Sequence, residues 1–162
     1  MPGMRRVALI LVLVAASAGC GGPTVDLATG LEVLDFSSGW HDEGIVDGQN
    51  KLVPSATFKL KNISDQNLPV LEVNAVFRRP DETQELGAAY FPVTRSEGLA
   101  PGAVSKPVAV KSAFGYKGSE PRNVMLENRL FVDAKVEIFA KYSSLQWKRI
   151  AEYPIERKLI TQ

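Results

Sequence analysis

An alternation of apolar and polar residues with a period of two recurs along most of this chain and constrains its fold more than any other feature. Because successive side chains of a strand point to opposite faces, this pattern predicts strands with one buried and one solvent-facing side. It is clean in the segment SATFKLKN, residues 55–62. It is longest in RLFVDAKVEIFAKY, residues 129–142, where the expected inward face is Leu130, Val132, Ala134, Val136, Ile138 and Ala140.

Turn-forming residues separate these segments from several other predicted strands. Asp47-Gly48 is typical of a hairpin turn, and short helical turns are compatible with SSGWHDEG (37–44) and PRNVMLENRL (121–130). About seven short strands at this spacing predict an all-β fold, an antiparallel immunoglobulin-like β-sandwich. The additional strands are expected at 31–36, 68–79, 86–93, within 98–112, and at 147–160.

The first thirty residues have a different character. Arg5 and Arg6 precede the apolar run VALILVLVAASA, residues 7–18. A basic start followed by a short apolar run is the layout of a secretory signal peptide, and the run is shorter than the roughly 20 residues that cross a bilayer. We therefore predict a cleaved N-terminal signal peptide and one domain at 31–162.

Cys20 is the only cysteine of the chain and follows small residues directly. The sequence Ser17-Ala18-Gly19-Cys20 resembles the lipobox of bacterial lipoproteins, although Ser17 stands where Leu is usual. The resemblance implies acylation of Cys20 with palmitate-type chains and cleavage before it, so that the signal peptide is 1–19 and a short tether follows at 20–30. Gly21, in place of Asp, implies the outer membrane facing the periplasm if the source is Gram-negative. Cleavage after Ala18 with plain secretion, or an uncleaved anchor, are the alternatives.

The net charge of the chain limits the classes of binding partner that we expect. Nineteen basic residues stand against eighteen acidic ones, and removal of 1–19 takes away Arg5 and Arg6. Nucleic-acid binding depends on a basic surplus that this chain lacks, so no nucleic-acid partner is predicted. No polybasic segment is present that would bind anionic lipids, so the expected membrane contact is the N-terminal lipid alone.

Residues 52–112 carry a second resemblance. The segment FKLKNISDQNLPVLEVNAVFRRPD, followed by an LAPG turn, is similar to the small immunoglobulin-like FxLYD-type domains of bacterial lipoproteins. The matching elements are Asn62-Ile63-Ser64, the alternating run 73–77 and the turn Pro101-Gly102. The Tyr-Asp of that pattern is replaced by Arg78 and Arg79. The resemblance implies a sandwich and non-catalytic binding.

Candidate chemistry is sparse. His41, Asp42 and Glu43 are adjacent in GWHDEG and offer a weak metal site or a base oriented by an acid. One histidine and an acylated cysteine leave too few ligands for structural zinc, and no Gly-x-Ser-x-Gly elbow accompanies His41. We therefore expect a solvated loop over a packed Trp40, no catalytic residue, no metal and no cofactor.

Two segments are candidate partner contacts. Phe114, Tyr116 and Lys117 place aromatic rings beside a cation in AFGYKG, which suits a protein or glycan surface, although the rings could instead plug the sandwich. Arg78 and Arg79 form an anion site or a solvated hairpin tip. The sequence predicts a lipid-anchored envelope binding or assembly module without catalysis. The alternatives are a metal-binding or hydrolytic protein centred on His41, and a structural homo-oligomer.

Overall fold

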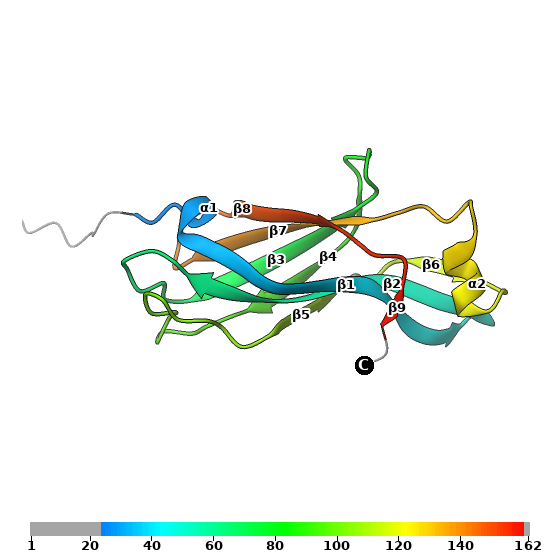
Figure 1. The fold of residues 1–162 in the computed structure, drawn as a ribbon, viewed down its shortest axis with the longest axis horizontal. Helices are drawn as coiled ribbons and strands as arrows, with labels where there is room; N and C mark the ends of the chain where they lie inside the picture. Colours follow the sequence, from blue (N-terminus) through cyan, green and yellow to red (C-terminus); the bar gives the residue numbers. More distant parts are fainter. Residues whose placement is uncertain (1–23, 161–162) are drawn as a thin grey trace, which may run out of the picture.

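A computed structural model describes residues 24–160 as two β-sheets packed face to face (Figure 1). The sheets enclose one apolar core, and two short helices lie at opposite ends of the sandwich. The elements are α1 Leu27–Gly30, β1 Leu31–Val46, β2 Gln49–Asn62, β3 Leu71–Arg78, β4 Glu85–Pro92, β5 Val108–Lys111, β6 Tyr116–Gly118, α2 Arg122–Glu127, β7 Lys135–Tyr142, β8 Lys148–Pro154 and β9 Leu159–Ile160.

The first sheet has the strand order β5-β2-β1-β9, with β6 paired to the other half of β2; the second has the order β4-β3-β7-β8. All pairings are antiparallel except the short parallel contact between β1 and β9. This arrangement confirms the predicted all-β sandwich. The sequence predicted about seven strands because β6 and β9, with three and two residues, are too short to show an alternation.

The alternating segments place their apolar residues between the sheets as predicted. Phe58 and Leu60 of β2 are fully buried, and so are Val73 and Phe77 of β3 and Ile138 of β7. Each buried side chain of this size contributes about 1.5–3 kcal/mol through removal of apolar surface from water. The period of two therefore fixes the register of both sheets.

The predicted strand at 129–142 is wrong in its first six residues, because β7 begins only at Lys135. Leu130 is 86% exposed and Val132 is 39% exposed, whereas Phe131 is buried. The ring of Phe131 packs 4.6 Å from Trp40 and 4.8 Å from Tyr116. This aromatic packing turns Phe131 inward and reverses the phase of the alternation before β7.

β1 is longer than predicted. The segment 37–46 continues the strand instead of forming a helical turn or a solvated loop, and Trp40 within it is fully buried. A register shift between Asp42 and Ile45 accompanies the left-handed Gly44 (φ 83°). The turn at Asp47 and Gly48 is confirmed, with φ of 54° and 77°, the two positive values that a tight hairpin turn of this kind requires.

The two turn motifs of 52–112 contact each other. The Asn62 side chain donates to the carbonyl oxygens of Gln66 and Leu99, both at 2.7 Å, and accepts from the Ser64 amide at 2.9 Å. The amide of Gly102, at φ 75°, donates to the Asn62 carbonyl at 2.8 Å. A buried asparagine thus satisfies the backbone of two loops at the end of the sandwich.

The predicted tether of 20–30 is shorter than expected, because its second part belongs to the domain. Asp26 caps α1 by accepting from the Ala28 amide at 3.1 Å, and Leu27 is buried in the core. The Val25 amide donates to the Tyr142 hydroxyl at 2.8 Å, which fastens the start of the domain to β7. Cys20 and the predicted signal peptide lie outside the described residues.

Candidate binding surface

The outer face of the four-stranded sheet carries charged side chains that pair across strands. Alternation along β3 and β7 sends Glu72, Arg78, Lys135, Glu137 and Lys141 to this face, opposite the core. Cross-strand ion pairs contribute modestly where exposed and more where neighbouring side chains exclude water. We call this surface the charged sheet face.

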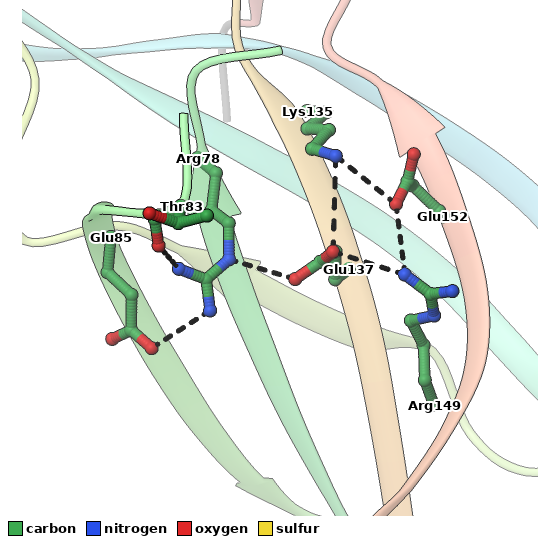
Figure 2. A network of polar contacts seen from close by, with 7 residues as sticks. All are labelled: Arg78, Thr83, Glu85, Lys135, Glu137, Arg149 and Glu152. Carbon is green, nitrogen blue, oxygen red and sulfur yellow. Dashed lines mark hydrogen bonds and ion pairs between the residues drawn. The ribbon is translucent and has the colours of Figure 1, made fainter. Parts of the chain in front are cut away.

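Glu137 is the centre of a network of polar contacts near the Lys135 end of β7 (Figure 2). Its carboxylate lies 2.9 Å from Nε of Arg78, 3.3 Å from Nη1 of Arg149 and 4.0 Å from Nζ of Lys135. Arg78 also donates to the Thr83 carbonyl and lies 3.2 Å from Glu85. One nearly buried carboxylate is therefore shared by cations from three strands.

The pKa of Glu137 lies below the usual value of a glutamate. Burial alone would raise it, but the hydrogen bond and positive charge of Arg78, with Lys135 and Arg149, outweigh this desolvation. The carboxylate therefore stays ionised near neutral pH and does not serve as a proton donor there. Glu137 therefore links β3, β7 and β8 through its ion pairs.

A groove of about 520 Å³ opens beside this network, at the ends of β7 and β8. Pairs of opposite charge border it: Arg157 lies 2.6 Å from Asp133, and Lys135 lies 3.4 Å from Glu152. Its volume is within the range of small-ligand sites. Apolar groups contribute the remaining surface, from Pro80, Ala134, Tyr153, Pro154 and Ile155. A groove that combines apolar groups with paired charges suits a short segment of a partner.

The other half of the charged sheet face combines charge with aromatic rings. Glu72 lies 2.8 Å from Nζ of Lys141 and accepts a hydrogen bond from the Tyr90 hydroxyl. Lys141 also lies 4.9 Å above the Trp147 ring, within cation–π distance. Lys141 and Tyr90 hold the pKa of Glu72 below its usual value, against the effect of burial. The face is polar, charge-balanced and internally paired.

The structure places the two candidate arginines differently. Arg78 is engaged by Glu137, Glu85 and Thr83 within the network, so its guanidinium is not a free anion site. Arg79 lies at the start of the following hairpin loop, 3.1 Å from Glu82. The pair therefore does not converge on one ligand position.

The three candidate residues of the aromatic loop, Phe114, Tyr116 and Lys117, lie in different surroundings. Phe114 is 66% exposed and lies close to Gly87 of β4, at the edge of the sandwich. Tyr116 begins β6 and packs against Trp40, with ring centroids 5.5 Å apart. Lys117 is paired with Asp47 at 2.5 Å. Phe114 remains the exposed aromatic of this segment, and Tyr116 belongs to the aromatic cluster at the end of the core.

His41, Asp42 and Glu43 do not form one centre. Asp42 is paired with Arg122 and Glu43 with Lys111 at 2.6 Å, whereas Nε2 of His41 is 3.7 Å from Glu43. The pKa of Glu43 is lowered, chiefly by the hydrogen bond from Lys111. Among residues 24–160, no group of three or more His, Cys, Asp or Glu side chains is placed to hold a metal ion.

Sequence reasoning missed the charged network because its members look like ordinary solvent-facing residues of alternating strands. The available signal was the run of opposite charges at Lys135 and Glu137, on the same face as Arg78 once β3 and β7 are paired. That pairing is a long-range property, set by the register Arg78↔Lys135. The groove beside it likewise depends on where β7 begins.

No family model matches this chain, and no curated protein is significantly similar to it. A solved structure, described as the X-ray structure of Northeast Structural Genomics Consortium target SoR45, is 11% identical, with a TM-score of 0.45 over 80% of this chain and 89% of that chain. Within the part of the chain that the structure describes, no helix is long and apolar enough to cross a membrane.

Proposed function

We propose that this chain is a bacterial lipoprotein, anchored by acylated Cys20, whose β-sandwich binds a partner at the cell envelope without catalysing a reaction. The observation that carries the proposal is the N-terminal sequence: Arg5-Arg6, the apolar run, small residues and then Cys20. Acylation on one residue with more than one chain gives stable anchoring where a single chain is marginal.

The start of the folded domain supports this proposal. Thr24 is the first described residue, and the segment from Val25 onward is already fastened to Tyr142. Only Gly21, Gly22 and Pro23 separate it from Cys20. A sandwich that begins so soon after the cysteine suits a domain held close to a membrane, in the periplasm if the source is Gram-negative.

Metabolic labelling with palmitate tests the anchor. The wild-type precursor, expressed in a bacterium with a lipoprotein pathway, incorporates label and fractionates with membranes. The Cys20→Ser variant loses both properties. Equal labelling of the two proteins would refute the lipoprotein proposal, and membrane association of an unlabelled Cys20→Ser protein would favour the uncleaved anchor.

The groove beside Glu137 is the partner site that we propose, with an envelope protein segment as its occupant. A photo-crosslinking residue at the exposed Pro80 position, within the groove, is expected to form a discrete adduct in intact cells. The same residue at Pro107, which is also exposed but lies outside the groove, is the matched control. Identical adducts at both positions would exclude the groove as the specific contact.

A further inference from the structure

We infer that the N-terminal end of the sandwich is a membrane-apposed surface, which seats the side chains of Val70, Leu145 and Trp147 in the headgroup region of the bilayer. The N-terminal end comprises residues 24–30, the loop 63–70 and the hairpin turn 143–147. This inference rests on the proposed acylation of Cys20. Beyond the lipid anchor, it identifies a surface of the sandwich that contacts the membrane.

The chain length between anchor and domain limits how far this end can stand from the lipid. Four residue steps separate Cys20 from Thr24, and an extended chain covers at most about 14 Å in four steps. The polar headgroup layer is itself about 6 Å deep on each side of the bilayer. The domain therefore begins within a short distance of the headgroups, and some of its surface must face them.

The surface next to Thr24 is apolar. A groove of about 260 Å³ lies between the start of the domain and the β7–β8 hairpin, and the groups exposed in it are mostly carbon. Val25, Leu27 and Leu145 contribute to it, with Tyr142 and Lys148. Leu145 and Trp147 are 36% and 39% exposed. The hairpin thus holds Leu145 beside the start of the domain, with the exposed Trp147 two residues further along the chain.

Val70 extends the same surface from a neighbouring loop. The Ser143 amide donates to the carbonyl oxygens of Pro69 and Val70, at 3.1 and 3.2 Å, which holds this loop against the hairpin turn. Val70 is 40% exposed and has a φ of 50°. A left-handed backbone is unfavourable for a β-branched residue. An exposed valine in this turn therefore costs stability, which a contact of its side chain with the membrane would offset.

The polar groups at this end are those that accompany an interfacial ring. Tryptophan is enriched where membrane meets water because its ring is apolar and its N–H is polar. Lys141 lies over the Trp147 ring and 2.8 Å from Glu72, and Lys148 borders the groove and lies 3.7 Å from Asp26. The stems of such lysines stay in apolar surroundings while their ammonium groups remain in the polar layer. Because each ammonium group is paired with a carboxylate, a zwitterionic lipid surface fits this set better than an anionic one.

Tryptophan fluorescence can test this contact, because the chain has only two tryptophans. Trp147 is exposed at the N-terminal end and Trp40 is fully buried in the core. The acylated wild-type protein is reconstituted in phosphatidylcholine vesicles with and without brominated chains. We expect bromine quenching of the Trp147 emission and none of the Trp40 emission. The Trp147→Phe variant, which retains only Trp40, is therefore expected to be insensitive to bromine.

A second variant keeps the test independent of folding. Leu145→Asp places a charge in the surface and is expected to reduce the bromine quenching of Trp147 while leaving the thermal midpoint nearly unchanged. Palmitate labelling is measured on every sample. Unlabelled protein would overturn the anchor and this inference together. Two outcomes would overturn this inference and leave the anchor standing. In the first, the protein is labelled with palmitate but the Trp147 emission is not quenched. In the second, the Cys20→Ser protein self-associates as its concentration rises and buries Trp147 between copies.

Discussion

The two ends of the sandwich both contain aromatic and apolar side chains but arrange them in opposite ways. At the opposite end, formed by β6, α2 and residues 128–134 and 155–158, the rings of Trp40, Tyr116 and Phe131 pack on one another. At the N-terminal end, Leu145 and Trp147 follow a turn and are 36% and 39% exposed. Both ends expose aliphatic side chains, among them Leu130 and Val132 at the opposite end. The difference lies in the rings, because those of the opposite end complete the core whereas that of Trp147 is partly open to solvent.

Arginine accounts for much of this difference. Arg157 donates to the carbonyl oxygens of Leu126, Asn128 and Phe131, and its guanidinium lies 5.4 Å from the Phe131 ring. It thereby satisfies an irregular stretch of backbone that no strand pairs. At the N-terminal end, the uncharged side chain of Asn62 and backbone hydrogen bonds join the loops instead. Apolar side chains at the two ends therefore make different contributions to stability.

The largest expected effect separates the two ends directly. Phe131→Ala removes the ring that packs between Trp40 and Tyr116, and we expect it to lower the free energy of unfolding by about 3–5 kcal/mol, as for other buried rings. Leu145→Ala, the matched truncation at the N-terminal end, should change it by less than about 1 kcal/mol. Urea unfolding measures both. Equal losses would remove the distinction between the ends.

Glu137→Gln tests how much the network of ion pairs around Glu137 stabilises the fold. We expect a loss of about 1–3 kcal/mol at pH 7, because Arg78 and its partners keep their positive charges without the carboxylate. The Glu137 pKa is lowered in the folded protein, so its stabilisation is complete above the unfolded glutamate value of about 4.3 and declines as the pH falls through the lower folded value. The difference between wild type and Glu137→Gln should therefore narrow in acid, and a constant difference would contradict the role of the charge.

Arg157→Met tests the closure of the opposite end. It keeps much of the stem but removes the donors to three carbonyl groups, and we expect a loss of about 1–2 kcal/mol. Hydrogen exchange should accelerate in α2 and residues 128–134 before it does so in β7. Lys59→Met removes an exposed pair with Asp35 of β1 and serves as the control. If exchange rises uniformly, Arg157 does not secure this segment locally.

The smallest effect is a gain at the N-terminal end. Val70→Gly relieves the left-handed valine, and we expect about 1 kcal/mol of added stability in thermal unfolding. Val104→Gly truncates a comparably exposed valine with an ordinary backbone and should be neutral or slightly destabilising. A loss of stability in Val70→Gly would mean that its side chain matters for the fold itself.

The sequence predicted the sandwich because its inward residues repeat every second position in β2, β3 and β7, and because Asp47-Gly48 encodes a tight turn locally. It failed at 129–134, where Phe131 is drawn inward by residues far away in sequence. It also failed at 37–46, where a strand contains Gly39, Asp42 and Gly44, residue types that are uncommon in strands. Both departures depend on contacts between distant segments.

The candidate site was harder to predict than the fold. Arg78 was selected for its neighbour Arg79, but its actual partner is Glu137, fifty-nine residues away in sequence. Tyr116 was a candidate surface ring with packing into the sandwich as the alternative, and the structure shows it packed against Trp40 and Phe131. Single-sequence patterns identify residues with suitable chemistry, whereas strand register decides which of them meet.

The hydrogen bond from the Val25 amide to the Tyr142 hydroxyl ties the start of the domain to one end of β7. β7 runs from Tyr142, beside the start of the domain, to Lys135 at the groove, a climb of about 23 Å at the rise of an extended strand. With the N-terminal end on the membrane, this strand would present the groove at a set height above the lipid. A membrane-anchored partner would then have to place its binding segment at the same height, so the distance of that segment from the membrane would help to determine which partner binds.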